Sequence, residues 1–331
     1  MYPSILPTTV GSMKGLILEN EKVRVVLIPE FGARILSLTY KPTEWEFAWH
    51  DPRVPMGRPT REVEFENVSG FFDCVPTCEP CTFKGRKLPP AGEVAFEPWR
   101  VVKKEKRRGS IAVTMQRQCD VYPLMVRKSV TISRNEPVVK LDYKLTNLSE
   151  EVLEYHYSGH NTLRIEPTYR IVLPSEVTEV KRGMAVTDRL GNLGDEIPWP
   201  MTADKSGKAL DLSMVGQPCD GTGENLYTPK LKEAWCAAFN ESRREAIGFS
   251  FQAEVLPYIL VWINYGGWRD YYHMPLEPTT GRPDNLEVAV NEWKNYAALQ
   301  PRSEVSWTEK IFVNHDVKHI ERISSENGII Q

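Results

Sequence analysis

The sequence has no long apolar run and no excess of positive charge. Its longest hydrophobic stretch, residues 256–263, contains Pro257 and is far shorter than the roughly 18 residues that a membrane-spanning helix needs. The formal net charge is −3 at pH 7, whereas a nucleic-acid-binding protein usually carries a basic surface that displaces counterions from phosphates. We therefore expect neither a membrane nor a nucleic acid as a partner.

The N-terminal segment also lacks the pattern of a secretory signal. Pro3 and Pro7 come early, and no apolar stretch follows a basic start. We expect a soluble cytoplasmic protein, in which the six cysteines remain reduced.

Little in the sequence favours helices, and alternation of apolar and polar residues recurs instead. Ile111, Val113 and Met115 alternate with polar or small residues, and residues 139–145 do so more regularly. Period-two alternation is typical of half-buried strands. Residues 134–137 predict a hairpin between two such strands. Further strands are expected at residues 23–28, 35–40, 152–157, 247–252, 258–264 and 307–313.

Only two regions depart from this pattern. Residues 285–299 permit one or two short helices, and residues 187–227 have little strand signal and are interpreted as a long surface excursion. The 25 prolines and 21 glycines are spread through the connections, as in proteins of many short strands. Because large β-sandwiches often exceed the usual domain length, we expect residues 1–331 to form a single domain.

A cluster of cysteines invites a metal-site interpretation. Cys74, Cys78 and Cys81 have the spacing with which radical enzymes hold an iron–sulfur cluster, but Pro76 and Pro80 interrupt the loop and the strand pattern is antiparallel. A zinc site would need a fourth ligand, such as Cys119 or a histidine. We interpret the cysteines as reduced side chains packed under a loop and expect no metal or organic cofactor. Iron in the purified protein would support the cluster enzyme, and its absence from metal analysis would exclude it.

Four segments together resemble the galactose-mutarotase-like proteins, which include aldose 1-epimerases and hexose-phosphate epimerases. They are VRVVLIPEFGARILSL (23–38), GFFDCVPTCEPCTFKGRKLPPAGEVAFEPW (70–99), LTNLSEEVLEYHYSGHNTLRI (145–165) and LPYILVWINYGGWRDYYHMPLEPTTGRPDNL (256–286). The resemblance implies a mainly β fold, a large antiparallel β super-sandwich with few short helices, whose concave face binds a small-molecule carbohydrate.

The same resemblance implies the residues of a catalytic site. Mutarotation needs a base for the anomeric hydroxyl and an acid for the ring oxygen, and the matching residues are Glu277 as base and His160 as acid. Expected substrate-binding residues are Arg34, Asp73, His156, Trp262 and His273. Arg58, Arg61, Arg164 and Arg269 are the cations available should the substrate carry a phosphate.

One position departs from the family pattern. Several of the epimerases carry a histidine directly before the glycine of the second segment, where this chain has Ala91 before Gly92. The leading hypothesis, which follows from the resemblance, is a sugar 1-epimerase that interconverts the anomers of a free or modified aldose, and the Ala91 departure motivates an alternative. The alternative is a carbohydrate-binding protein of the same fold without the chemistry. The sequence leaves a homodimer open.

Overall fold

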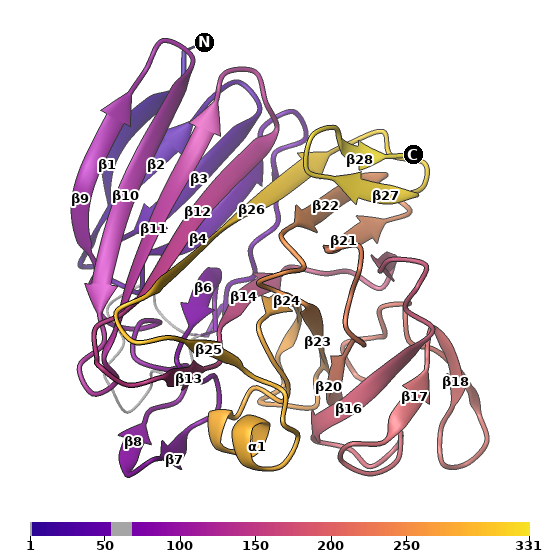
Figure 1. The fold of residues 1–331 in the computed structure, drawn as a ribbon. Helices are drawn as coiled ribbons and strands as arrows, with labels where there is room; N and C mark the ends of the chain where they lie inside the picture. Colours follow the sequence, from indigo (N-terminus) through magenta and orange to yellow (C-terminus); the bar gives the residue numbers. More distant parts are fainter. Residues whose placement is uncertain (1, 54–67) are drawn as a thin grey trace.

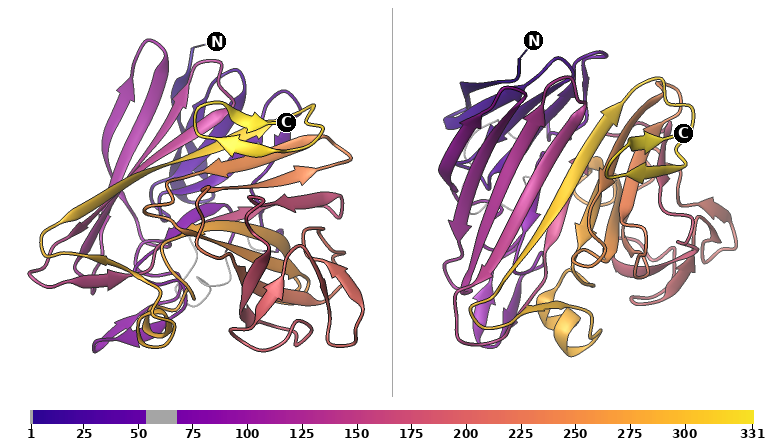
Figure 2. Two further views of the ribbon diagram at one scale, coloured as in Figure 1. Left: turned by 45° about the vertical axis from the view of Figure 1, so that its right-hand side comes forward. Right: turned by 45° about the horizontal axis from the view of Figure 1, so that its top comes forward.

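The computed structural model describes residues 2–53 and 68–331, which form two large antiparallel sheets packed face to face (Figures 1 and 2). In Figure 1 the strands β9–β12 and β26 lie in front of β1–β4. The predicted mainly β, sandwich-like fold is thus confirmed. No helix in the described part of the chain is both long and apolar enough to cross a bilayer.

The larger sheet has twelve strands within the described residues. Its order is β1 (Ser4–Val10), β2 (Met13–Glu19), β3 (Val23–Ile28), β4 (Arg34–Tyr40), β6 (Phe71–Cys74), β14 (Ser158–Leu163), β24 (Tyr272–Thr279), β23 (Tyr258–Tyr265), β20 (Thr222–Tyr227), β16 (Glu179–Ala185) and β17 (Glu196–Pro198), and β5 (Trp45–Glu46) pairs with β4.

The smaller sheet has eight strands in the same part of the chain. Its order is β15 (Tyr169–Val172), β21 (Trp235–Asn240), β22 (Glu245–Ser250), β26 (Glu304–Asn314), β12 (Val138–Asn147), β11 (Leu124–Ser133), β10 (Ser110–Gln118) and β9 (Arg100–Lys106). Four two-stranded ribbons complete the β structure: β7 (Cys81–Phe83) with β8 (Arg86–Leu88), β13 (Leu153–Tyr155) with β25 (Ala297–Leu299), β18 (Met201–Ala203) with β19 (Ala209–Asp211), and β27 (Arg322–Ser324) with β28 (Gly328–Ile330).

Alternate side chains of the two sheets form the core between them. Ile111, Val113 and Met115 of β10 are buried, as the period-two pattern predicts, and residues 134–137 form the turn between β11 and β12. Asn135 in this turn has a φ of 61°, a left-handed conformation that asparagine tolerates better than most residues.

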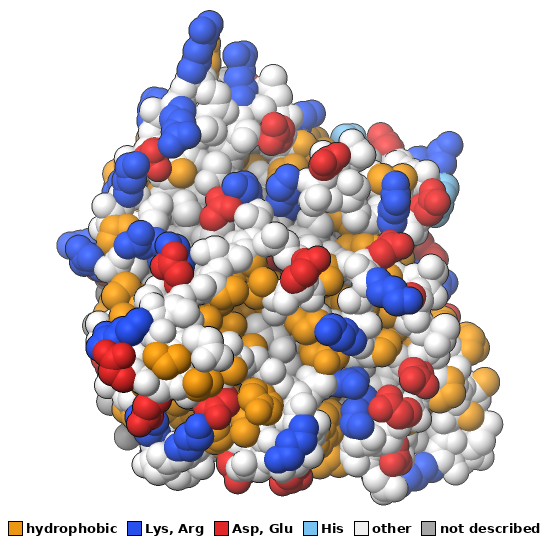
Figure 3. All heavy atoms as spheres, in the orientation of Figure 1, with side chains coloured by type: hydrophobic (Ala, Val, Ile, Leu, Met, Phe, Trp, Pro, Cys, Tyr) orange, Lys and Arg blue, Asp and Glu red, His pale blue; other side chains and the backbone are white. Residues whose placement is uncertain are grey.

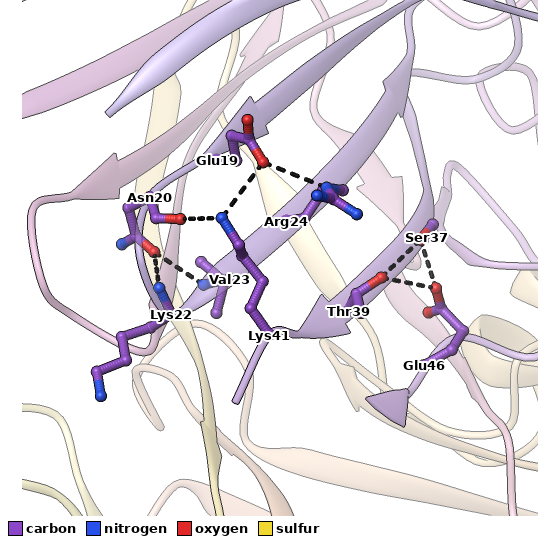
Figure 4. Close-up of polar contacts among 9 residues, drawn as sticks. All are labelled: Glu19, Asn20, Lys22, Val23, Arg24, Ser37, Thr39, Lys41 and Glu46. Carbon is purple, nitrogen blue, oxygen red and sulfur yellow. Dashed lines mark hydrogen bonds and ion pairs between the residues drawn. The ribbon is translucent and has the colours of Figure 1, made fainter. Parts of the chain in front are cut away.

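A buried asparagine connects the two sheets near their upper edge. The Asn20 side-chain oxygen accepts from the backbone N–H groups of Lys22 (2.7 Å) and Val23 (2.8 Å), which shapes the turn between β2 and β3 (Figure 4). Its Nδ2 donates to the carbonyl oxygens of Ser133 (2.6 Å) and Glu136 (2.8 Å) at the β11–β12 turn of the other sheet. One side chain thus satisfies the backbone groups of both turns.

The prediction of a surface excursion at residues 187–227 needs correction, whereas that of a short helix within residues 285–299 is confirmed. Residues 187–227 include four strands, and the last of them, β20, is entirely buried between β16 and β23. Because both faces of β20 are covered, its sequence lacks the alternation on which the prediction depended. Residues 285–299 contain the one α-helix of the described residues, α1 (Leu286–Asn291), followed by β25.

The outer surface of the smaller sheet is rich in charged side chains. On the face shown in Figure 3, basic side chains are frequent over β9–β12, and acidic ones are interspersed with them. These charges follow from the outward-facing positions of strands whose alternate residues fill the core.

Candidate active site

A pocket of about 240 Å³ lies on the larger sheet, on the face that points away from the smaller sheet. Strands β6, β14, β24, β23 and β20 form its floor. Its lining consists of Val68, Phe72, Cys78, Glu79, Pro80, Ala91, Phe96, His160, Met184, Asn225, Leu260, Trp262, Trp268, Glu277 and Asp284. The volume is slightly below the usual range for drug-sized ligands, roughly 300–1,000 Å³, which favours a small ligand.

The strand register places the two predicted catalytic residues beside each other. Asn161 of β14 pairs with Leu276 of β24, so the adjoining residues His160 and Glu277 are neighbours across the two strands. His160 also pairs with Phe72 of β6. Within β24 the side chains alternate, so that Leu276 enters the core while Glu277 points into the pocket.

Glu277 is only 1% exposed. Its Oε2 accepts a hydrogen bond from the Ser158 hydroxyl at 2.6 Å, and its Oε1 lies 3.6 Å from Nε2 of His160. Burial raises the pKa of the Glu277 carboxyl well above its usual value, and the Ser158 hydrogen bond offsets part of that rise. The carboxylate, once formed, is therefore a stronger base than a glutamate in water.

His160 is held by a ring below it and a hydroxyl beside it. Its imidazole stacks on Phe72, with 4.3 Å between ring centroids, and Nδ1 lies 3.0 Å from Oγ1 of Thr162. Burial, followed by the charges of His273 and Arg34, lowers the pKa of His160 well below its usual value. A neutral ring that accepts from Thr162 at Nδ1 carries its proton on Nε2, the nitrogen nearest Glu277.

Aromatic side chains form one wall of the pocket. The Trp262 ring meets His160 and Trp268 at centroid distances of 5.6 and 5.2 Å. Two polar atoms of the lining, Nε1 of Trp262 and Oδ1 of Asn225, are buried and have no hydrogen-bond partner among the described residues. A sugar hydroxyl, which both donates and accepts, can satisfy either atom.

Arg34 and His273 lie behind the pocket wall. The Arg34 guanidinium is fully buried between the rings of Phe31 and Phe72, 4.1 and 4.2 Å from their centroids, and donates to the carbonyl oxygen of Ser69 at 2.6 Å. Burial lowers its pKa to about 9. His273 meets Trp262 edge-on at 4.9 Å. Neither residue lines the pocket, and both support side chains that do.

Asp73 and His156 are not brought to the pocket. On β6 the pocket face carries Phe72 and Cys74, so Asp73 points into the core, where it accepts from Nζ of Lys128 at 2.9 Å. His156 precedes β14, and its Nε2 lies 3.2 Å from Oγ1 of Thr279. Asp73 and His156, which were expected to contact the sugar, therefore contact other protein side chains.

Two pocket carboxyls were not among the residues predicted from the sequence. Asp284 accepts from the Tyr227 hydroxyl at 2.7 Å through Oδ1, and its backbone oxygen accepts from the N–H groups of Cys78 and Glu79 at 2.9 and 3.1 Å. Glu79 thereby lies next to Asp284 in the lining. No local pattern marks either residue, because their proximity depends on two loops that are far apart in the sequence.

Ala91 also lines the pocket, and it has a φ of 57°. The position where some epimerases have a histidine therefore faces the pocket with a methyl group. The next residue is Gly92, where an added Cβ would lie 2.1 Å from the carbonyl oxygen of Val75. This loop therefore requires glycine at residue 92.

The cysteines and the candidate phosphate-binding arginines have other surroundings. Sγ of Cys78 lies 3.4 Å from Sγ of Cys74, whereas Cys81 contacts Thr77. The described residues contain no group of three or more His, Cys, Asp or Glu side chains arranged to hold a metal ion. Arg164 lies over the Trp45 ring and Arg269 over Trp268, and Arg58 and Arg61 fall outside the described residues.

Comparison with known proteins supports the fold. The chain matches no protein-family model and no curated protein. It is similar to a solved structure from Klebsiella pneumoniae that is provisionally named an aldose 1-epimerase, with 16% identity, coverage of 92% of this chain and 80% of that one, and a TM-score of 0.72.

Two further solved structures are galactose mutarotase-like proteins. One, from Clostridium acetobutylicum, has 12% identity, coverage of 95% of this chain and 99% of that one, and a TM-score of 0.65. The other, from Lactobacillus casei, has 15% identity, coverage of 91% and 100%, and a TM-score of 0.64. The chain therefore has the galactose mutarotase-like fold.

Proposed function

We propose that this protein is a sugar 1-epimerase that interconverts the anomers of a free or modified aldose. The observation that carries the proposal is the pairing of Glu277 and His160, buried side by side on the pocket floor with 3.6 Å between Oε1 and Nε2. A proton acceptor and a proton donor at this separation can act on the two oxygens attached to the anomeric carbon of one sugar ring.

In the proposed reaction the Glu277 carboxylate takes the proton from the anomeric hydroxyl, while His160 gives a proton to the ring oxygen. The bond between the anomeric carbon and the ring oxygen breaks, and the carbonyl group of the open-chain sugar forms. Rotation of this carbonyl followed by the reverse transfers closes the ring with the other configuration. Glu277 gives up the proton that it took and His160 regains the proton that it gave, so the cycle is balanced.

The protonation states that burial favours for Glu277 and His160 support this scheme. Burial favours the uncharged form, with the proton on Glu277 and a neutral imidazole on His160. A sugar hydroxyl that donates to Glu277 stabilises its carboxylate, which favours transfer of the proton to His160. Protonated Glu277 with neutral His160 and ionised Glu277 with protonated His160 contain the same number of protons. The pH dependence of kcat is therefore expected to report the ionisation of the two residues together and not of either one alone.

The test is anomer exchange measured by NMR or polarimetry over a panel of free aldoses. We expect the variant Glu277→Gln to lose roughly 100- to 10,000-fold in rate, the usual contribution of a positioned acid or base. The control is Glu292→Gln, which makes the same substitution at an exposed residue outside the pocket lining. An unchanged rate in Glu277→Gln would remove Glu277 from the mechanism.

The second candidate is a carbohydrate-binding protein without catalysis, and the Ala91 methyl group in the pocket lining favours it. That function predicts saturable binding of a sugar by calorimetry with no acceleration of anomer exchange. Any exchange that depends on Glu277 excludes it.

A further inference from the structure

The pocket contains a second pair of acidic groups that the proposed proton transfers do not use. Glu79 and Asp284 both line it, and they come from the loop after β6 and the loop after β24. The Asp284 backbone oxygen fixes the two loops together by accepting from the N–H of Glu79 at 3.1 Å. The two carboxyl groups are close enough for the charge of Asp284 to act on Glu79.

The surroundings of this pair are acidic, apolar or neutral polar, and Nδ2 of Asn285 donates to Oε2 of Glu79 at 3.5 Å. No lysine or arginine belongs to the pocket lining among the described residues. The titratable groups that face the pair are Glu277, Tyr227, Cys74 and Cys78. The charge of Asp284, followed by burial, raises the pKa of Glu79 to about 7, and burial raises the pKa of Asp284. The pair therefore retains a proton to a higher pH than two isolated carboxyls would.

An independent feature points to a ligand at this end of the pocket. Asn225 is 4% exposed, and its Oδ1 has no hydrogen-bond partner among the described residues although it lines the pocket. Asn225 is two residues before Tyr227 on β20, so both side chains are on the same face, and Tyr227 is the residue that holds Asp284. An amide oxygen only accepts, so this atom requires a donor.

The aromatic wall of the pocket also favours a positively charged group. The ring of Trp262 belongs to the same lining, and the face of an indole ring attracts cations, as Arg269 over the neighbouring Trp268 ring illustrates. Carboxyl oxygens, an amide oxygen and the face of an indole ring together suit a protonated amine, which has three donors and no acceptor.

We propose that Glu79, Asp284 and Asn225 form a subsite for a protonated amine, so that the preferred aldose is an amino sugar. This inference rests on the proposed function, because it takes the pocket to hold an aldose. An ammonium group beside the pair lets both carboxyls ionise and satisfies the Asn225 oxygen. A phosphate or carboxylate group on the sugar would instead meet like charges.

The inference is tested by calorimetry with amino sugars and their uncharged counterparts. The probes are glucose with an amino group at position 2, 3 or 6, glucose itself, N-acetylglucosamine and glucose 6-phosphate. We expect at least one amino sugar to bind about tenfold or more tightly than glucose, the scale of a hydrogen bond to a charged group. We expect the phosphate to bind more weakly than glucose.

The variant Glu79→Gln should reduce the ratio of amino-sugar affinity to glucose affinity toward one. Glu292→Gln, an exposed residue outside the lining, serves as the control with the same loss of charge. Binding of the amino sugar to the unaltered protein should also release a proton, seen as a dependence of the binding heat on the ionisation enthalpy of the buffer. This measurement needs no variant.

The outcomes separate this inference from the proposed function. Anomer exchange without any preference for an amine, or a preference unchanged by Glu79→Gln, overturns the amine subsite alone. Tight amino-sugar binding with proton release but no anomer exchange supports the subsite and overturns the epimerase. If no sugar binds, both are wrong.

Discussion

At the scale of single residues, a hydrogen-bond donor without a protein partner is informative. Nε1 of Trp262 has no partner among the described residues, whereas the ring that carries it packs edge-on against His273, with 4.9 Å between the ring centroids. A buried N–H group without a partner is costly unless a ligand or water completes it. The ring and the N–H group of Trp262 thus have separable roles.

Replacement of Trp262 by phenylalanine separates these roles. We expect the variant Trp262→Phe to bind its sugar roughly 2- to 10-fold more weakly, because one hydrogen bond is lost, with little change in the free energy of unfolding. Trp45→Phe is the matched control: Nε1 of Trp45 donates to Tyr169 at 3.0 Å in the core, so stability should fall and sugar affinity should not. Unchanged sugar affinity in Trp262→Phe, with a fall in stability, would mean that Nε1 of Trp262 does not bind the sugar.

Sequence reasoning reached some of the pocket residues and not others. Glu277, His160 and Trp262 belong to segments that resemble known relatives, and all three line the pocket. Asp73 belongs to such a segment too, but the register of β6 turns it toward the core. Glu79 and Asp284 could not be predicted, because only the folded loops bring them together.

At the scale of secondary-structure elements, β6 connects the pocket to the core. Phe72 supports His160 on one face, and on the other face Asp73 forms a buried ion pair with Lys128 of β11. The hydroxyls of Tyr143 and Tyr157 also donate to Oδ1 of Asp73, at 2.9 and 3.0 Å. These contacts join the two sheets directly behind the site.

Removal of one partner from this pair should be strongly destabilising. We expect Lys128→Met to lower the free energy of unfolding by about 3–5 kcal/mol, because an unpaired buried carboxylate remains. Adding Asp73→Asn should restore part of the loss. Chemical denaturation provides the measurement, and the exposed Lys140→Met is the control.

The same variants test the role that the sequence suggested for Asp73. If Asp73 acts only in the core, the folded double variant retains its sugar affinity. A stable double variant that has lost its affinity would instead identify Asp73 as a ligand-binding residue.

Strands with one face in solvent were predicted from the sequence, whereas a strand buried on both faces was not. β10 and β12 have one face in the core and one in solvent, and their alternation is visible in the sequence. β20 is buried on both faces, since Leu226 enters the core and Asn225 lines the pocket. A strand without a solvent-facing side has no polar face to alternate with, so periodicity alone could not identify it.

At the scale of the whole molecule, the space between the sheets contains ionisable groups as well as apolar ones. Glu309 of β26 is 2% exposed and accepts from Nε1 of Trp307 at 2.9 Å, and its Oε1 lies 3.1 Å from the Tyr157 hydroxyl. Burial raises the pKa of Glu309 from 4.5 to about 7. The folded protein thus holds this proton over a pH range in which the unfolded chain releases it.

This difference makes stability depend on pH. Because the pKa is raised in the folded state, the contribution of Glu309 is present below pH 4.5 and is lost as the pH rises toward about 7. The loss corresponds to roughly 3 kcal/mol. We expect Glu309→Gln to gain about this amount relative to the unaltered protein between the two pH values.

Unfolding free energies of both proteins at each pH provide the measurement. The control is Glu304→Gln at the exposed start of the same strand, whose ion pair with Lys144 is on the surface. Parallel pH curves for the unaltered protein and Glu309→Gln would show that Glu309 titrates in the same way in both states.

The arrangement of β24 limits how this protein can change during evolution. Leu276 fills the core and the next residue, Glu277, is the proposed base in the pocket. One face of the strand therefore contributes to stability and the other to the proposed catalysis. Insertion or deletion of a single residue would exchange these two sides, driving a carboxyl into the hydrophobic interior and a leucine into the pocket. New specificities must therefore arise by substitution along strands of fixed length, or in the loops that carry Glu79 and Asp284.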